Sequence, residues 1–445
     1  MRQENKFFQT VCNLAIPVAL QSMLQASFSI VDQIMIGQLG SVAVAGVGLA
    51  GKFSSIYSVL VSAIGAVAGI MISQYMGQEN RREVRRSFFL NLFVAMGLAV
   101  MFTALCMLFP REIMGFYTKD EATKIAAAKY LFIIAGTFLT VAGATMLSTM
   151  FRCMEKAILP LIASMVAACL NTVLNYVFIF GKLGFDAMGA EGAAIATLLS
   201  QVVNFLIMLV LFIQYRDCLA RDREKDKKTS FNWTQYMEIL LPIFVCEFVW
   251  SLGENVYAVI YGHLGTESCA AMTLINPIQS LMIGALCGLS QAASVIVGKK
   301  LGNREYDEAY IASKKLLVYG FVGSVMLSVI IVLISSVYVN IYQVEESVKV
   351  LTKQILFAYA IIAPFKVQNM ILGGGIIRSG GKTKYVMFID MIGTWIFGVP
   401  LGLLSAFVFE LSIPYVYFIL SLEECVRFAI SLVVLKRKNW MQSLD

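Results

Sequence analysis

The first long apolar stretch of the chain, from about residue 13 to residue 36, contains an aspartate, Asp32. Gln21, Gln25 and Ser29 precede it at steps of four, four and three residues, so the four polar side chains share one face of an α-helix. A carboxylate at bilayer depth costs roughly 2.5–3.5 kcal/mol when central and less near an interface. Asp32 is therefore expected to face a protein interior or a wet cavity, where it could bind a cation or a proton, or simply pair with a neighbouring helix.

Amide and hydroxyl side chains in two later apolar segments lie at a similar depth. Asn171 and Asn175 share one face of the fifth segment, and Thr197 lies in the sixth. Counted from the outer ends, Asp32, Asn175 and Thr197 are each about four to six residues inside, which is roughly 6–9 Å at the α-helical rise. One carboxylate with amide and hydroxyl oxygens at one level could hold Na⁺ or shelter a protonatable aspartate. Interhelical hydrogen bonding alone would also account for these residues.

Charged residues also occur in apolar segments of the second half of the chain. Glu247 and Glu254 share one face of the seventh segment, and Lys366 lies in the tenth. A pair between Lys366 and one of these glutamates would reduce the cost of burying both, as a static strut or as a switch. Gln25, Glu247, Glu254 and Lys366 are candidates for a substrate site or for a polar site in the C-terminal half.

The elements that must position these residues are membrane-spanning helices. The chain has 445 residues, of which 59% are hydrophobic and only 14% are charged, whereas a soluble domain carries about 25% charged residues. Segments of about 20 apolar residues recur along its whole length and leave no room for a sizeable soluble domain. We predict an all-α polytopic membrane protein with twelve transmembrane helices. The predicted spans cover approximately residues 13–36, 44–73, 87–109, 130–150, 159–181, 192–214, 238–262, 268–297, 316–338, 355–377, 384–408 and 413–435.

Alternate loops differ in charge. One set, which includes both chain ends and the loop with Arg378, Lys382 and Lys384, carries most of the Lys and Arg residues. Positive charge marks the cytoplasmic side, so we expect both termini in the cytoplasm. The net charge of +7 then reflects these loops and not a nucleic-acid partner.

The two halves of the chain repeat. The matching pairs are Pro17 with Pro242, Gly37 with Gly262 and Gly77 with Gly302 at one constant offset, and Arg152 with Arg378 at an offset that is one residue longer. Six spans per half give both halves the same orientation, and such parallel repeats are a transporter architecture. We predict two six-helix lobes related by this parallel internal repeat, residues 1–214 and 236–445, joined by a cytoplasmic linker at 215–235.

The sequence contains no motif for metal binding, phosphate binding or nucleophilic catalysis. The nine cysteines lack CxxC spacing, and the single histidine, His263, cannot build a metal cluster. The glycine-rich stretches match neither phosphate-binding fingerprint, and no nucleophile–base motif occurs. The protein is therefore not expected to be an enzyme or to carry a cofactor.

Several stretches together resemble a known family. They are LAIPVALQSMLQASFSIVDQIMIGQLG, ISQYMGQEN, TMFRCMEKAILP, GAEGAAIATLLSQ and IIRSGGKTK. The chain resembles the multidrug and toxic compound extrusion (MATE) transporters over nearly its whole length. The resemblance implies antiport, in which a Na⁺ or H⁺ gradient drives cationic or amphipathic compounds out between two six-helix lobes by alternating access.

The resemblance also implies roles for residues of the first half. Asp32 matches the family's first-helix acid, and Asn171 and Thr197 match other residues of its N-lobe cation site. The fourth member is often Asp, but here it is Asn175. One carboxylate remains, which suffices to neutralise one Na⁺ or to carry one proton.

The second half departs from the NorM-like branch of the family. That branch has an acid on the seventh helix where this chain has Trp250, with Glu247 and Glu254 on either side of it. Its tenth-helix acid has no counterpart near Lys366 and Val367. An N-lobe mechanism is therefore expected, as in the DinF-like branch.

The expected protein is a monomeric exporter of organic cations or amphipaths in the cell (inner) membrane, coupled to Na⁺ or H⁺. The nearest alternative is a lipid-linked precursor flippase of the same superfamily. A flippase should carry a cationic cavity for pyrophosphate, and only Lys52, Lys366 and Arg427 lie within or near the apolar segments.

Overall fold

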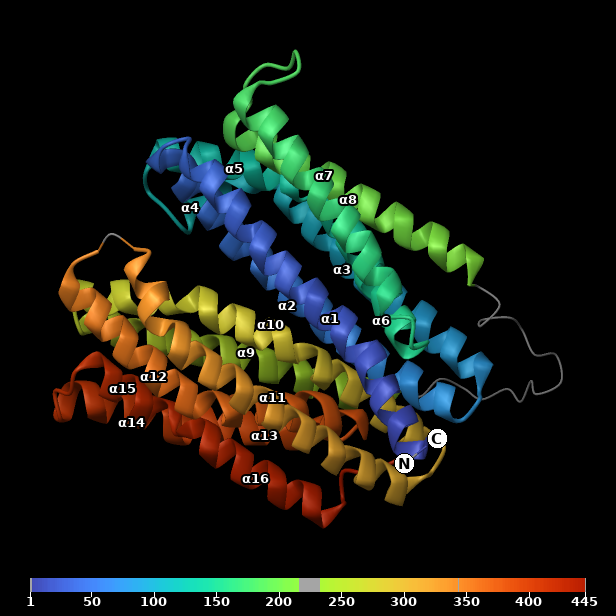
Figure 1. Ribbon diagram of the computed structural model, residues 1–445. Coiled ribbons are helices and arrows are strands. Elements are labelled where there is room, and N and C mark those ends of the chain that lie inside the picture. Colours follow the sequence, from blue (N-terminus) through green and yellow to red (C-terminus); the bar gives the residue numbers. More distant parts are fainter. Residues whose placement is uncertain (1, 216–232, 343, 445) are drawn as a thin grey trace. The chain divides into compact units, whose positions relative to one another are not determined.

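The computed structural model describes residues 2–215, 233–342 and 344–444, and all regular elements in these ranges are helices (Figure 1). The predicted all-α class is therefore confirmed. The first half contains α1 (Arg2–Gly37), α2 (Ser41–Gly77), α3 (Arg81–Leu108), α4 (Pro110–Gly115), α5 (Glu121–Ile134), α6 (Thr137–Cys153), α7 (Ile158–Phe180) and α8 (Gly189–Gln214). The second half contains α9 (Trp233–His263), α10 (Thr266–Gly302), α11 (Tyr306–Asn340), α12 (Glu346–Asn369), η2 (Met370–Ile377), α13 (Thr383–Met391), η3 (Ile392–Gly398), α14 (Val399–Leu403), η4 (Leu404–Val408), α15 (Ile413–Ser421) and α16 (Glu423–Arg437).

Most of the predicted spans are single helices. Among the described residues, ten helices are long and apolar enough to cross a membrane, and a bent pair of helices, α5 with α6, brings the number to eleven. The last predicted span, 413–435, is divided between α15 and α16 by a turn at Leu422. Neither piece is long enough to count alone.

The predicted span 130–150 is broken. The chain bends by 47° between α5 and α6. The Thr103 hydroxyl donates to the Ala135 carbonyl at 3.1 Å, and the Thr137 hydroxyl donates to the Ile134 carbonyl at 2.7 Å. Hydroxyl donors thus satisfy carbonyls at the bend, which is how a break is tolerated where water is absent.

The chain forms two compact units. Among the described residues, one unit comprises 20–72 and 80–215, and the other comprises 2–19, 73–79, 233–342 and 344–444. We call them the N-terminal and C-terminal units, although the C-terminal unit also takes the first part of α1. The predicted lobe boundaries stay a prediction, and most of the predicted linker 215–235 lies outside the described residues.

Helices α7 and α8 form an antiparallel pair in the N-terminal unit (Figure 1). The turn after α7 begins at Gly181, whose φ of +65° favours glycine. At Gly192 the helices come so close that a Cβ atom would lie 2.7 Å from the Phe178 carbonyl oxygen. This close approach sets the α7 and α8 side chains against each other.

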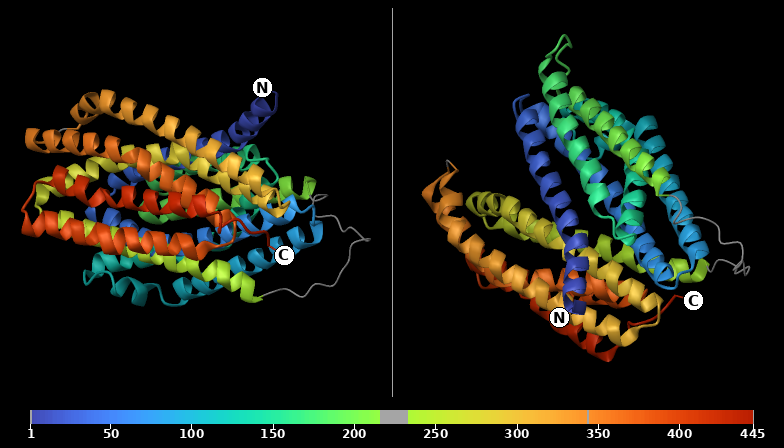
Figure 2. Two further views of the ribbon diagram at one scale, coloured as in Figure 1. Left: turned by 90° about the horizontal axis from the view of Figure 1, so that it is seen from below. Right: turned by 45° about the vertical axis from the view of Figure 1, so that its right-hand side comes forward.

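The C-terminal unit differs in the regularity of its helices. Its helices, coloured yellow to red, run side by side in both views of Figure 2. Three segments of its last third, η2, η3 and η4, are π-helical. A π-helix is wider than an α-helix and occurs frequently at functional sites. Here the segment η3 borders the charged cluster described below.

Candidate functional site

Helices α1, α7 and α8 bring four predicted residues together in the N-terminal unit. Asn175 Nδ2 donates to Asp32 Oδ1 at 2.6 Å and to Asn171 Oδ1 at 3.2 Å. In one orientation the Asn171 amide donates to Thr197 Oγ1 at 3.4 Å. Turned over, its nitrogen lies 3.0 and 3.1 Å from the two Asp32 carboxylate oxygens. We call these four residues the Asp32 cluster, and the contacts agree with the depths counted from the sequence.

Local helix geometry explains the contacts. Asn171 and Asn175 are one turn apart on α7 and are 8% and 1% exposed. The Thr197 hydroxyl donates to the Ala193 carbonyl at 3.0 Å, so its oxygen still has capacity to accept. Beyond the cluster, Ile36 and Ile179 pack with Ala193. Apolar packing thus covers one side of Asp32.

One oxygen of the Asp32 cluster lacks a donor. Asn175 Oδ1 is buried and has no hydrogen-bond partner among the described residues. Leaving such a group unpaired costs about 1–3 kcal/mol, and its presence calls for an explanation such as an ion or water. In the same described ranges no Lys or Arg forms an ion pair with Asp32. The cluster therefore combines one carboxylate with neutral oxygens, which suits a monovalent cation or a proton.

Tyr130 is a residue near this cluster that the sequence reasoning missed. It lies on α5, packs against the Ile36 group and lies within electrostatic range of Asp32. No polar spacing identified it, because it stands at the edge of a predicted span. Gln25, by contrast, is exposed on α1, two turns and about 10 Å along the axis from Asp32, and remains a candidate only.

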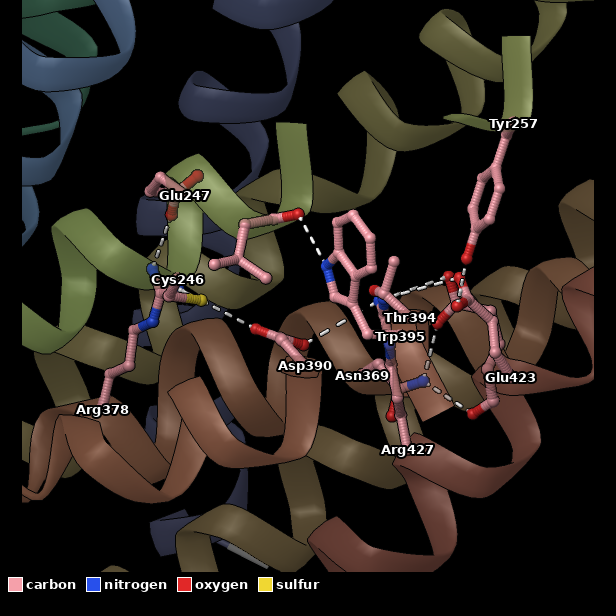
Figure 3. Close-up of polar contacts among 12 residues, drawn as sticks. Cys246, Glu247, Tyr257, Asn369, Arg378, Asp390, Thr394, Trp395, Glu423 and Arg427 are labelled. Atoms are coloured by element: carbon pink, nitrogen blue, oxygen red, sulfur yellow. Dashed lines mark hydrogen bonds and ion pairs between the residues drawn. The ribbon is translucent and has the colours of Figure 1, made fainter. Parts of the chain in front are cut away.

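A second polar group, in the C-terminal unit, centres on Arg427 of α16 (Figure 3). Its guanidinium nitrogens lie 3.4 Å from Glu423 Oε1, 3.8 Å from Asp390 Oδ1 and 3.9 Å from Glu424 Oε1. Arg427, Glu423 and Glu424 are all buried. We call Arg427 and its three carboxylate partners the Arg427 cluster. With three carboxylates around one guanidinium, the cluster has an excess of negative charge.

Hydrogen bonds hold the carboxylates of this cluster. The Tyr257 hydroxyl donates to Glu423 Oε2 at 2.5 Å, and Asn369 Nδ2 donates to Glu424 Oε2 at 2.8 Å. Arg427 also donates to the Thr394 hydroxyl of η3. These contacts link α9, α12 and η3 to α16, as Figure 3 shows.

Glycines on η3 make room for the Arg427 cluster. A Cβ atom at Gly393 would overlap the Arg427 side chain. At Gly398 it would overlap the Tyr257 hydroxyl and the Glu423 carboxylate. The charged groups thus lie directly against the backbone of the π-helical segment.

Glu247 pairs with Arg378 and not with Lys366. Arg378 Nη1 lies 3.2 Å from Glu247 Oε1, with side chains 14% and 30% exposed. The Cys246 thiol of the same turn donates to Asp390 Oδ2 at 2.9 Å. The placement of Arg378 in a basic loop was wrong, because the helix after η2 continues to Ser379 and keeps Arg378 against α9.

The predicted pairing of Lys366 with Glu247 or Glu254 is therefore not formed. Across the described ranges no carboxylate lies within ion-pair distance of Lys366, although Glu423 is within electrostatic range. Lys366 and Glu254 both line a cavity of about 360 Å³ instead. The structure thus places both side chains at one cavity without a direct contact between them.

Comparison with known proteins agrees with this organisation. The MatE family model matches residues 17–177 and again residues 242–404. The two matches start at Pro17 and Pro242, the first matching pair of the predicted repeat. The probable multidrug resistance protein NorM of Thermotoga maritima is 27% identical over 405 residues, 90% of this chain and 86% of that protein. The Pasteurella multocida protein of the same name is 25% identical over 408 residues, 87% of this chain and 84% of that one.

A solved structure shows the same fold. An aspartate-to-asparagine mutant of the Vibrio cholerae MATE transporter VcmN superimposes with a TM-score of 0.89 at 16% identity, covering 99% of this chain and 100% of that one. The relatives named above carry NorM names, so they give no support to the predicted DinF-like branch. The two family matches nevertheless cover well over half of the sequence, and this multi-pass membrane protein therefore belongs to the MatE family.

Proposed function

We propose that this protein exports cationic or amphipathic small molecules across the cell membrane in exchange for Na⁺ or H⁺. The observation that carries the proposal is the Asp32 cluster, where the unpaired Asn175 oxygen adjoins the Asp32 carboxylate. The names of the two NorM relatives, probable multidrug resistance proteins, support the substrate class. We further propose that the protein acts as a monomer with both termini in the cytoplasm, as the loop charges favour.

The chemistry of the Asp32 cluster suits exchange of one positive charge. A proton would bind to Asp32 itself, while Na⁺ would draw on Asp32, Asn175 and Thr197 oxygens. Either cation neutralises the carboxylate, and its release leaves a charge that is costly at membrane depth. That cost couples occupancy of the cluster to a change of conformation, and so to alternating access. An N-lobe mechanism of the DinF-like kind remains part of this proposal.

The test is gradient-driven export from proteoliposomes by Asp32→Asn. The amide keeps the size of the side chain but can neither bind a proton nor neutralise Na⁺. Export of a fluorescent cation is measured separately under a Na⁺ gradient and a pH gradient. We expect the variant to lose export under whichever gradient drives the wild type.

A matched control is Asp186→Asn, the same exchange on an exposed loop residue. It should export as the wild type does. Wild-type export by Asp32→Asn under the driving gradient would overturn the proposed coupling role. The comparison of gradients also identifies the ion.

The flippase alternative is not favoured. Two cavities of the C-terminal unit, of about 360 and 300 Å³, share Lys366 and Glu424. Five carboxylates line them against three basic side chains, the latter being Lys366, Arg378 and Arg427. A net negative lining repels a pyrophosphate group.

A further inference from the structure

The cavity of about 360 Å³ that contains Lys366 has the features of a small-molecule site. We call it the Lys366 cavity. Helices α9, α10, α12, α15 and α16 line it, and its volume lies within the usual range of ligand pockets. Four of its lining residues, Glu254, Ala258, Thr273 and Asn276, are exposed. The cavity therefore opens at the surface of the unit along α9 and α10.

Aromatic rings form much of the wall of this cavity. Tyr257, Tyr261, Tyr359 and Tyr417 line it, and the Tyr261 and Tyr417 ring centroids are 6.4 Å apart. The Tyr417 hydroxyl accepts a hydrogen bond from Gln279 Nε2 at 2.8 Å. Tyrosine rings fixed in this way offer flat apolar surfaces with polar edges, which suit an aromatic ligand.

Of the four charged side chains that line the cavity, two are in ion pairs and two are not. Glu423 and Glu424 are held by Arg427. The side chains of Lys366 and Glu254, in contrast, form no ion pair or hydrogen bond with any described residue. One positive and one negative side chain thus face the same cavity, and each would gain from a counter-charge on a ligand.

We infer that the Lys366 cavity binds zwitterionic aromatic compounds. The ligand's carboxylate faces Lys366, its cationic group faces Glu254, and its ring system lies among the tyrosines. This inference rests on the proposed export function and names the substrate class of that function. It makes Lys366 a specificity-determining residue, because a purely cationic ligand gains nothing from the ammonium group.

Lys366 could instead only balance the charge of the Arg427 cluster. Asp390, Glu423 and Glu424 against Arg427 leave two negative charges, and Lys366 is within electrostatic range of Glu423. In that case its loss would weaken the fold and affect all ligands equally. A pair of ligands that differ only in the carboxylate separates the two roles.

The experiment uses rhodamine 110, a zwitterion with a free carboxylate, and rhodamine 123, its methyl ester. Binding is measured by fluorescence anisotropy on the full-length protein in detergent, and export is measured in proteoliposomes. For Lys366→Met we expect rhodamine 110 affinity to fall about tenfold or more, the loss typical of a hydrogen bond to a charged group. Rhodamine 123 affinity should change less than about twofold. Lys366→Arg should keep the wild-type preference.

The control variant is Lys353→Met, on the same helix α12 but lining a separate cavity of about 670 Å³. It should bind both dyes as the wild type does. Equal losses of both dyes in Lys366→Met, or no loss of rhodamine 110, would overturn the inference. Failure of the wild type to bind rhodamine 110 would overturn it as well. Selective binding without gradient-driven export would instead refute the proposed function and leave the binding inference standing.

Discussion

Removal of the guanidinium from the Arg427 cluster should strongly destabilise the C-terminal unit. In Arg427→Met the carboxylates of Asp390, Glu423 and Glu424 lose the one cation within 4 Å of all three. Two of them, Glu423 and Glu424, are only 5% and 7% exposed, so water solvates the carboxylates poorly once the guanidinium is gone. Breaking a buried ion pair by removing one partner costs about 3–5 kcal/mol. At roughly 2–4 °C per kcal/mol for a unit of this size, the melting temperature should fall by about 6–20 °C.

Tryptophan fluorescence on heating in detergent is a suitable assay. The protein has four tryptophans, namely Trp233, Trp250, Trp395 and Trp440, and all four lie in the C-terminal unit. Trp440 is fully buried. The fluorescence therefore reports the unit that holds the Arg427 cluster and not the other one.

Two companion variants sharpen this prediction. Lys438→Met breaks a surface pair with Asp307 in the same unit, whose side chains are 46% and 92% exposed, and should cost less than about 1 kcal/mol. Adding Glu423→Gln to Arg427→Met removes one of the orphaned charges and should recover part of the loss. A melting temperature within about 2 °C of the wild type for Arg427→Met would refute the electrostatic reasoning.

Two further predictions concern backbone and capping. Gly393→Ala should lower stability by about 1–3 kcal/mol, because the added Cβ atom overlaps Arg427. Gly97→Ala should raise stability by about 0.4–1 kcal/mol, because Gly97 is helical and no atom lies within 4 Å of the added Cβ atom. Scanning calorimetry of both variants checks this pair, and equal effects on stability would contradict it. Asp120 caps α5 by accepting from the Thr123 amide at 2.9 Å, and hydrogen bonds from Thr123 hold the pKa of its carboxyl below the ordinary 3.8. The cap should therefore persist at neutral pH and be lost only as the pH falls below 3.8. The rate of amide hydrogen exchange at Thr123 should rise in Asp120→Ala but not in Asp120→Asn. An unchanged rate in the alanine variant would exclude the cap.

The helical class and the Asp32 cluster could be predicted from sequence for physical reasons. Apolar segments long enough to span a bilayer have few alternatives to a helix. Asp32, Asn175 and Thr197 could be grouped because depth in a membrane follows from counting residues along each span. The contacts between α1, α7 and α8 in the structure show that these side chains, together with Asn171, also lie next to one another.

The Arg427 cluster could not be found in this way. Its members come from two different spans, and Glu423 and Glu424 stand beside the turn at Leu422. No periodic spacing connects them to Asp390. The partner of Glu247 was missed as well, because a helix end is uncertain by a few residues and Arg378 lies just past the predicted end.

The π-helical segments have a consequence for how such a chain can evolve. The offset between the two halves is one residue longer at Arg152 and Arg378 than at Gly77 and Gly302, and η2 ends one residue before Arg378. An extra residue inside a membrane helix cannot loop out, because its backbone groups would be left without partners. A wider turn absorbs it and keeps the backbone bonded. A single-residue insertion can thus be tolerated in these spans, because the wider turn lets the side chains that follow keep about the same helix face.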